Sequence, residues 1–225
     1  MPPADSLEPR KPAQPAQPER ARFGYAFMRL LCRIVYRTYF RGRTLHLDRV
    51  PNSGPVLLVA NHQSFLDPPI AALSLNRECG YIARDSLFRN PLIRRLFVYL
   101  NAFPVKRGAA DVNAVKELLR RLKNGKAVLI FPEATRTRDG SIGRINPNSL
   151  AVAKRAGVPI VPTLIDGAFE ALPRGAIIPR PRRLSVVYGE PITAAEAGEW
   201  PIERVVETVT ERLQLAKREL AALSR

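Results

Sequence analysis

Short apolar runs separated by helix-forming segments constrain this chain more than any other feature of its sequence. Residues 56–60 read Val-Leu-Leu-Val-Ala and residues 127–131 read Ala-Val-Leu-Ile-Phe, and turn-forming residues flank both runs. Runs of this length without polar alternation are typical of strands that are buried on both faces of a sheet. Because such strands need helices on both sides, the pattern predicts an α/β fold.

The rest of the chain alternates in the same way, and its 225 residues are enough for one domain with a sizeable core. We therefore expect a single domain, over residues 43–225, with a mostly parallel or mixed sheet of about seven strands and flanking helices. The predicted strands cover residues 44–48, 56–60, 80–83, 103–106, 127–131, 158–165 and 184–188. The predicted helices cover residues 22–41, 68–75, 91–100, 111–123, 149–156 and 201–223.

The first 42 residues form two regions of different composition. Residues 1–20 contain six prolines and few large apolar groups, which predicts a disordered tail. Residues 21–42 place apolar side chains at helical spacing beside arginines that recur every four positions, which predicts a basic amphipathic helix that lies in a membrane interface. The alternative is a surface helix packed on its own domain, with its arginines simply solvated. The arginines of this repeat are Arg29, Arg33, Arg37 and Arg41.

The charge of the chain predicts an anionic partner. Its 36 Lys and Arg against 20 Asp and Glu give a net charge of +16, which fits nucleic acid, a membrane surface or a phosphorylated substrate. No stretch is long and apolar enough to span a bilayer, so we expect a peripheral or monotopic protein on the cytoplasmic face of a membrane. The two cysteines, Cys32 and Cys79, suit a reducing compartment and supply no metal site.

A candidate base follows the strand predicted at residues 56–60. His62 and Asp67 are five residues apart, which on a helix would point the two side chains well away from each other. A turn that ends at Asp67 can instead fold the carboxylate back onto the imidazole, fix its tautomer and leave the second ring nitrogen as a base. In the alternative interpretation, Asp67 only caps the next helix and His62 is an ordinary turn residue.

No protein nucleophile accompanies this base. Ser64 lacks the Gly-x-Ser-x-Gly context of a nucleophile elbow, and neither cysteine has a reason to be reactive. The pattern therefore favours direct deprotonation of a substrate hydroxyl by His62.

A second polar block, Phe-Pro-Glu-Ala-Thr-Arg at residues 131–136, follows another predicted strand. Arg136 can present a fork of donors to phosphate oxygens, and Thr135 can add a further donor. Glu133 can accept from a substrate hydroxyl or simply hold Arg136, and a surface loop with a local ion pair is the alternative for the whole block. Arg107 is a third candidate for binding an anion.

These blocks together resemble the glycerolipid acyltransferase family, that of the 1-acyl-glycerol-3-phosphate acyltransferases. The His-x-x-x-x-Asp signature of that family matches residues 62–67, with Asn61 before it and Ser64 inside it. The Phe-Pro-Glu-Gly-Thr-Arg motif matches residues 131–136, the intervening arginine motif matches residues 105–107, and a valine-proline segment matches residues 158–162. Order and spacing agree from about residue 42 to residue 188.

The resemblance implies an O-acyltransferase that converts 1-acyl-glycerol-3-phosphate to phosphatidate. His62 would take the proton from the acceptor hydroxyl, and Asp67 would orient His62. Arg107, Glu133, Thr135 and Arg136 would hold the phosphate and glycerol of a lysophospholipid. Acyl-CoA or acyl carrier protein would be the donor, and no metal or redox cofactor is implied.

Two departures from the family pattern leave the acceptor open. Ala134 stands where the family usually has glycine, and residues 145–148 read Ile-Asn-Pro-Asn where it usually has Phe-Lys-Pro-Gly, so a basic residue is missing. Another lysolipid or lipid alcohol is an alternative acceptor, and a degenerate, non-catalytic lipid-binding member is an alternative function. A nucleic-acid-binding protein is a remote alternative, because no recognisable nucleic-acid-binding motif accompanies the positive charge.

Overall fold

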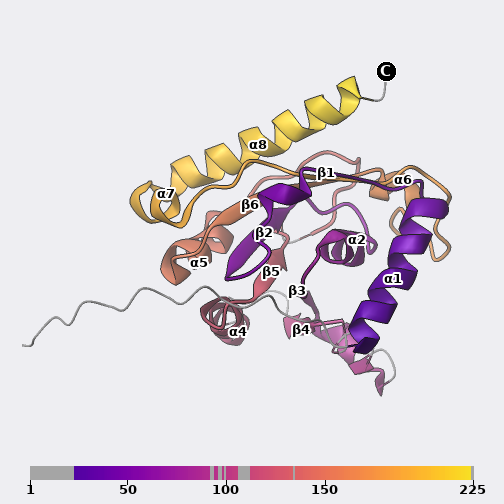
Figure 1. Ribbon diagram of the computed structural model, residues 1–225, viewed down its shortest axis with the longest axis horizontal. Helices are drawn as coiled ribbons and strands as arrows, with labels where there is room; N and C mark the ends of the chain where they lie inside the picture. The colour runs from indigo at the N-terminus through magenta and orange to yellow at the C-terminus, as the bar shows by residue number, and fades with distance from the viewer. Residues whose placement is uncertain are drawn as a thin grey trace, which may run out of the picture.

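The apolar runs form one mixed sheet, with helices on both of its faces (Figure 1). The computed structural model describes residues 23–91, 94–95, 98, 100–105, 112–133 and 135–223. Within these residues the sheet has seven strands in the order β1-β7-β6-β2-β5-β3-β4. Neighbouring strands are parallel except β6 and β7, which are antiparallel. The predicted α/β class and strand number are confirmed.

The strands are β1 (Arg43–Leu45), β2 (Val56–Ala60), β3 (Cys79–Arg84), β4 (Ala102–Val105), β5 (Ala127–Ile130), β6 (Ile160–Asp166) and β7 (Ser185–Tyr188). The helices are α1 (Phe23–Thr38), α2 (Asp67–Ser74), α4 (Val112–Lys123), α5 (Pro147–Ala156), α6 (Ala168–Ala171), α7 (Ala194–Glu199) and α8 (Ile202–Ala222). The tail expected at residues 1–20 and half of the helix expected at residues 91–100 lie outside the described residues.

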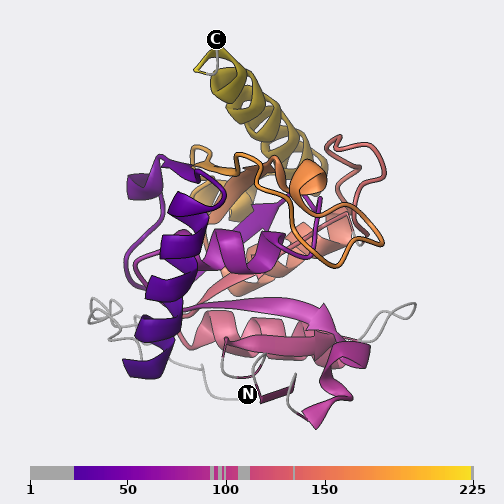
Figure 2. The same ribbon diagram turned by 90° about the vertical axis from the view of Figure 1, so that its right-hand side faces the viewer.

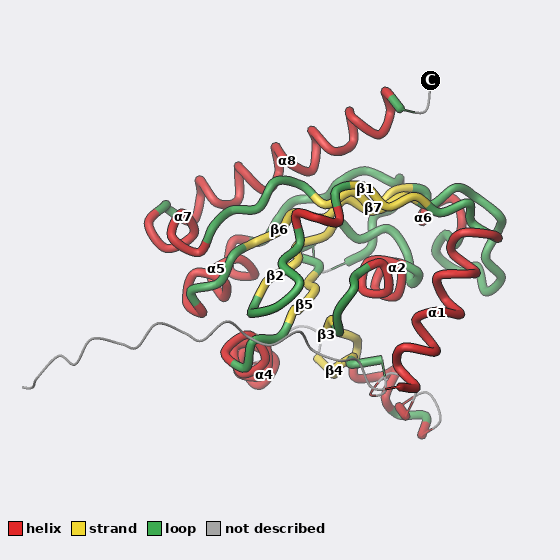
Figure 3. The backbone as a smooth tube through the Cα atoms, in the orientation of Figure 1, coloured by secondary structure: helices red, strands yellow, loops and turns green. Residues whose placement is uncertain are grey.

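Both faces of the sheet carry an apolar core, which explains why the strands read as continuous apolar runs. In β2, Leu58 and Ala60 pack with α2 on one face, while Leu57 and Val59 pack with α4, α5 and α8 on the other. Every residue of β2 is fully buried. Figure 3 shows the resulting layers, with α2 and α1 on one side of the strands and α4, α5 and α8 on the other.

The strand predicted at residues 44–48 is shorter than expected. His46 has a left-handed backbone with φ 56°, and residues Leu47–Arg49 form a 3-10 turn, so the strand ends at Leu45. His46 is about one third exposed, and its Nε2 is 2.7 Å from Oε1 of Glu219 on α8. The alternation of Leu45, His46 and Leu47 therefore does not reflect a strand.

Helix α1 binds its own domain through arginines rather than through its apolar side. Arg29 donates to the carbonyl of Leu75 over 3.2 Å, and Arg33 donates to the carbonyls of Ser74 and Leu75 over 3.1 and 2.8 Å. These carbonyls end α2 and would otherwise lack partners. The helix ends at Thr38, before the last arginine of the predicted repeat. Of the four arginines in the repeat, Arg29 and Arg33 therefore face the domain, and Arg41 lies beyond the helix.

The apolar side of α1 is exposed. Five large side chains on this face are 42–56% exposed: Phe27, Leu30, Leu31, Ile34 and Val35. The alternative of a helix packed on its own domain with solvated arginines is wrong for Arg29 and Arg33, which bind the end of α2. An ordinary surface helix turns its apolar side toward the protein and its charged side toward water. Helix α1 instead exposes large apolar side chains and turns Arg29 and Arg33 toward the domain.

Tyr36 fastens the inner side of α1 to the sheet edge. Its hydroxyl donates to the carbonyl of Arg43, and the same oxygen lies 3.3 Å from the carbonyl of Leu184. Burial raises the pKa of Tyr36 to about 12. The polar tip of Tyr36 thus faces the protein.

Candidate active site

Asn61 ends β2 and directs the chain away from the sheet. Its side-chain amide donates to the carbonyl of Ile165 over 2.8 Å and accepts from the N–H of Ile165 over 2.7 Å. This pair of bonds continues the β2–β6 ladder with a side chain in place of backbone. The backbone of the next residue is thereby free to turn, and His62 lies just beyond the carboxyl end of the strand, where α/β proteins place their ligand sites.

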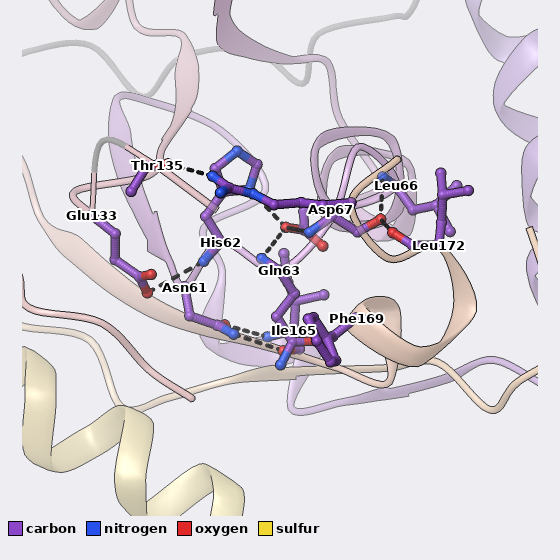
Figure 4. Close-up of polar contacts among 12 residues, drawn as sticks. Asn61, His62, Gln63, Leu66, Asp67, Glu133, Thr135, Ile165, Phe169 and Leu172 are labelled. Atoms are coloured by element: carbon purple, nitrogen blue, oxygen red, sulfur yellow. Dashed lines mark hydrogen bonds and ion pairs between the residues drawn. The ribbon is translucent and has the colours of Figure 1, made fainter. Parts of the chain in front are cut away.

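The turn folds Asp67 back onto His62, as the spacing predicts (Figure 4). Nδ1 of His62 is 2.8 Å from Oδ2 of Asp67. The same oxygen accepts the backbone N–H groups of Gln63 and Ser64 over 2.6 and 2.7 Å. With Nδ1 donating, Nε2 keeps its lone pair, and within the described residues no hydrogen bond engages it.

Asp67 is the first residue of α2 and not its N-cap. The N-cap is Leu66, which has no side-chain capping bond, and Pro68 and Pro69 occupy the first turn. The carboxylate serves the turn and the imidazole instead, so the interpretation of Asp67 as a helix cap is wrong. Burial raises the pKa of Asp67, while the hydrogen bonds from His62, Ser64 and Gln63 oppose that shift.

Two further side chains hold the same turn in place. The side-chain amide of Gln63 donates to the carbonyl of Gly140 over 3.1 Å and accepts from the N–H of Phe169 over 3.3 Å. The hydroxyl of Ser64 donates to the carbonyl of Leu172 over 2.9 Å. Gln63 is a supporting residue that the sequence pattern did not single out, because its role depends on two segments that are far away in the chain.

The second block lies directly against the first. The ring of Phe131 stacks on His62 with centroids 4.2 Å apart and an angle of 26° between the planes. The N–H of His62 donates to Oε1 of Glu133 over 3.3 Å, and the N–H of Thr137 donates to the carbonyl of His62 over 2.8 Å. The two predicted blocks are therefore brought together.

Glu133 contacts backbone rather than Arg136. Besides His62 it accepts from the N–H of Gly143, and a side chain at position 143 would approach Oε2 of Glu133 to 2.6 Å. The guanidinium of Arg136 instead lies 3.8 Å from the centre of the exposed ring of Phe65. The contacts given for the described residues thus place Glu133 against backbone N–H groups and Arg136 against an aromatic ring.

Replacing Glu133 with glutamine should change how stability depends on pH. Burial raises the pKa of Glu133 to about 7. A carboxyl whose pKa is raised by folding contributes stability that is complete below its unfolded value of about 4.3 and is lost as pH rises through the folded value. The Tm of the wild type relative to Glu133→Gln should therefore fall by about 2–4 °C between pH 5 and pH 8, a modest shift because Glu133 is partly exposed. Parallel Tm curves in thermal unfolding would contradict this assignment.

An arginine-rich cleft of about 350 Å³ opens beside Glu133. Nη2 of Arg174 donates to Oγ1 of Thr135 over 2.7 Å across this cleft. Asp139, which also lines the cleft, accepts hydrogen bonds from the hydroxyls of Thr137 and Ser141. Arg174 comes from the segment after α6, which carries no motif and was therefore not predicted. The cations of the lining are Arg136, Arg138, Arg144 and Arg174. Arg107, the remaining predicted binding residue, lies outside the described residues. Ala134, which replaces the usual glycine of the family motif, also lies outside them.

Two negative findings apply to the described part of the chain. It contains no group of three or more His, Cys, Asp or Glu side chains arranged to bind a metal ion. None of its helices combines the length and the apolar character that crossing a membrane requires.

Residues 43–166 match the family described as Acyltransferase. The chain belongs to the Acyltransferase family. A chloroplastic 1-acyl-sn-glycerol-3-phosphate acyltransferase of Arabidopsis thaliana is 31% identical over 162 residues, which are 71% of this chain and 45% of that protein. A 1-acyl-sn-glycerol-3-phosphate acyltransferase of Bacillus subtilis is 24% identical over 174 residues, which are 77% and 84% of the two proteins.

Two further relatives of this Acyltransferase-family chain extend the comparison. The crystal structure of the 1-acyl-sn-glycerophosphate acyltransferase PlsC from Thermotoga maritima matches with a TM-score of 0.73 and 27% identity, covering 89% of this chain and 79% of that one. An N-acylphosphatidylethanolamine synthase of Arabidopsis thaliana is 32% identical over 178 residues, which are 70% and 61% of the two proteins. The chain spans about half the length of the first plant relatives it matches. The resemblance drawn from the four sequence blocks is confirmed.

Proposed function

We propose that this protein transfers a fatty acyl group to the free hydroxyl of a lysophospholipid, with 1-acyl-glycerol-3-phosphate as the acceptor and phosphatidate as the product. The observation that carries the proposal is the contact of the partly exposed His62 with the buried Asp67, beside a cleft lined by arginines. A base with a free Nε2 suits a hydroxyl, and the cations suit a phosphate on the same small molecule. The names of the Arabidopsis and Bacillus relatives, both 1-acyl-sn-glycerol-3-phosphate acyltransferases, support this acceptor.

The chemistry follows from the geometry of His62. Nε2 takes the proton of the acceptor hydroxyl while that oxygen attacks the carbonyl carbon of a thioester, either acyl-CoA or acyl carrier protein. A C–O bond forms, the C–S bond breaks, and the departing thiolate recovers the proton from the imidazolium. Asp67 is fully buried, so its negative charge acts on the imidazolium with little screening from water.

We assign the acceptor phosphate to the cleft formed by Arg136, Arg144 and Arg174. Arg174 lies beside Thr135 and brings a cation to the site from a segment remote in sequence. It thus offers a substitute for the basic residue that is missing at residues 145–148. Thr135 and Glu133 complete the contacts to phosphate and glycerol, and Arg107 remains a proposed ligand.

Replacing Arg174 with alanine should raise the KM for lysophosphatidate about 10-fold and leave kcat within about 3-fold. One charge-assisted hydrogen bond to phosphate at a partly exposed site has roughly this worth. Arg174→Lys should recover part of the affinity, because it keeps the charge and loses the fork. Arg155→Ala on α5, which removes an exposed arginine away from the cleft, should change neither constant. Steady-state kinetics with varied acceptor would test this, and an unchanged KM in Arg174→Ala would reject the assignment.

We further propose that the protein works as a peripheral or monotopic protein on an anionic membrane, at its cytoplasmic face. The exposed apolar side of α1 supports this, because a row of large apolar side chains with about half of their surface exposed is unfavourable in water. The positive net charge adds attraction to anionic lipid.

The direct test is acyl transfer by the purified protein with vesicles, acyl-CoA and a panel of acceptors. We expect free thiol release together with phosphatidate identified by mass. The N-acylphosphatidylethanolamine synthase among the relatives favours a second candidate, an acyltransferase with another phospholipid head group as acceptor, so the panel includes lysophospholipids and phosphatidylethanolamine. Repetition with acyl carrier protein tests the donor. Failure with every donor and acceptor would leave a non-catalytic lipid-binding member as the better interpretation.

A further inference from the structure

The segment between α6 and β7 carries the two most exposed large apolar side chains among the described residues. Ile177 and Ile178 are 91% and 80% exposed, compared with at most 60% for any other large apolar side chain. Residues 173–183, which we term the isoleucine segment, also contain four arginines and no acid. Adjacent isoleucines held in water are costly unless something covers them.

The backbone of the isoleucine segment is tied at both ends of its exposed tip. The N–H of Ala176 donates to the carbonyl of Pro173 over 3.2 Å, and the N–H of Arg180 donates to the carbonyl of Ala171 over 2.7 Å. Pro179 and Pro181 further restrict the chain just after the isoleucines. The two side chains are therefore presented by an ordered turn.

One end of the isoleucine segment touches the candidate active site. Leu172, just before the segment, accepts from the hydroxyl of Ser64 over 2.9 Å, and Arg174 donates to Thr135 over 2.7 Å. The isoleucines are therefore only a few residues from a side chain that lines the arginine-rich cleft.

The other end touches α1. The hydroxyl of Tyr39, just after α1, donates to the carbonyl of Pro179 over 2.8 Å, and the N–H of Leu184 donates to the carbonyl of Phe40 over 3.1 Å. Figure 2 shows α1 and the segment between α6 and β7 on the same side of the molecule, facing the viewer. The segment thus bridges the exposed apolar helix and the mouth of the cleft.

We propose that Ile177 and Ile178 insert into an anionic phospholipid bilayer and form one docking surface with α1. Charge complementarity identifies the occupant, because exposed Arg180, Arg182 and Arg183 flank the isoleucines and suit lipid phosphates at the level of the head groups. Docking at this point sets the mouth of the cleft at the membrane surface, where a lysolipid enters with its acyl chain still in the bilayer. The location of the mouth rests on the proposed function, whereas the insertion does not.

The test measures partitioning of the full chain onto vesicles of phosphatidylcholine with about 30% phosphatidylglycerol. The double variant Ile177→Ser/Ile178→Ser should lower the partition constant at least 10-fold, because two apolar side chains no longer leave water. The matched control is Leu215→Ser/Leu223→Ser, which removes two side chains that are 58% and 56% exposed in and after α8. It should stay within 2-fold of the wild type.

A second readout separates docking from catalysis. With lysophosphatidate in vesicles, the isoleucine double variant should lose activity in proportion to binding, while a water-soluble short-chain lysophosphatidate should be acylated at the wild-type rate. If the protein had no acyltransferase activity, the partition measurement would still decide the docking proposal. Equal partitioning of wild type and double variant would overturn it, as would a wild type that does not bind vesicles, which would point to a protein partner instead.

Discussion

Replacing His62 with alanine should lower the acyl-transfer rate by a factor of about 10³. A positioned general base contributes about 10²–10⁴-fold, and His62, which is held by Asp67 and donates its N–H to the cleft residue Glu133, is the proposed base. The Asp67–Oδ2 contacts to Gln63 and Ser64 remain in the variant, so the turn should survive. The measurement is kcat with saturating lysophosphatidate, together with vesicle partitioning, which should be unchanged.

The second histidine of the chain provides the matched control. His46 is also 2.7 Å from a carboxylate, that of Glu219, but both side chains are about one third exposed. His46 follows β1 and Glu219 lies on α8, and neither lines the arginine-rich cleft. His46→Ala should keep kcat within about 2-fold and lose at most about 1 kcal/mol of stability. If His62→Ala kept wild-type turnover, or both variants lost it equally, His62 would not be the base.

Replacing Gly167 with alanine should destabilise the fold by about 3 kcal/mol or more. Gly167 has φ +81°, and a Cβ placed there would be 2.0 Å from the carbonyl oxygen of Arg183. That oxygen belongs to the backbone entering β7, so it can move only by disturbing the pairing of Asp166 with Ser185. The expected fall in Tm is about 6–12 °C, measured by calorimetry or circular dichroism.

Gly54 separates the two causes of this effect. It has a similar φ of +77°, but a side chain there would meet nothing within 4 Å. Gly54→Ala should therefore cost only the conformational term of about 1 kcal/mol. Equal losses of Tm in the two variants would mean that the close approach to Arg183 is relieved without cost.

The sequence predicted the centre of the sheet better than its edge. Strand β2 has the predicted limits, and β5 differs by one residue, because a strand buried on both faces must be apolar throughout. The first strand is an outer one, and there the pattern of Leu45, His46 and Leu47 could not reveal the left-handed backbone of His46. The reversed direction of β7 follows from how residues 167–184 pack, which local pattern does not encode.

The candidate site divides in the same way. The contact between His62 and Asp67 could be predicted, because five residues and a turn determine it. The parts supplied by distant segments could not, such as Gln63 between Gly140 and Phe169, or Arg174 at Thr135. Outside the site, helix α7 was not among the predicted helices, although the Thr-x-x-Glu spacing of Thr193 and Glu196 is the signal of a helix start. The catalytic and binding roles themselves remain predictions.

The short outer strand β1 has a consequence for solubility. It is three residues long and follows α1, and it covers one side of β7, whose four residues are all buried. A version of the protein shortened past Leu45 would leave β7 with an open row of backbone N–H and C=O groups beside Val186 and Val187. Uncharged apolar edges of this kind pair with other chains. Trimming the apolar helix to obtain a better-behaved protein would therefore promote aggregation, whereas serine substitutions on the exposed face of α1 would preserve the covered edge.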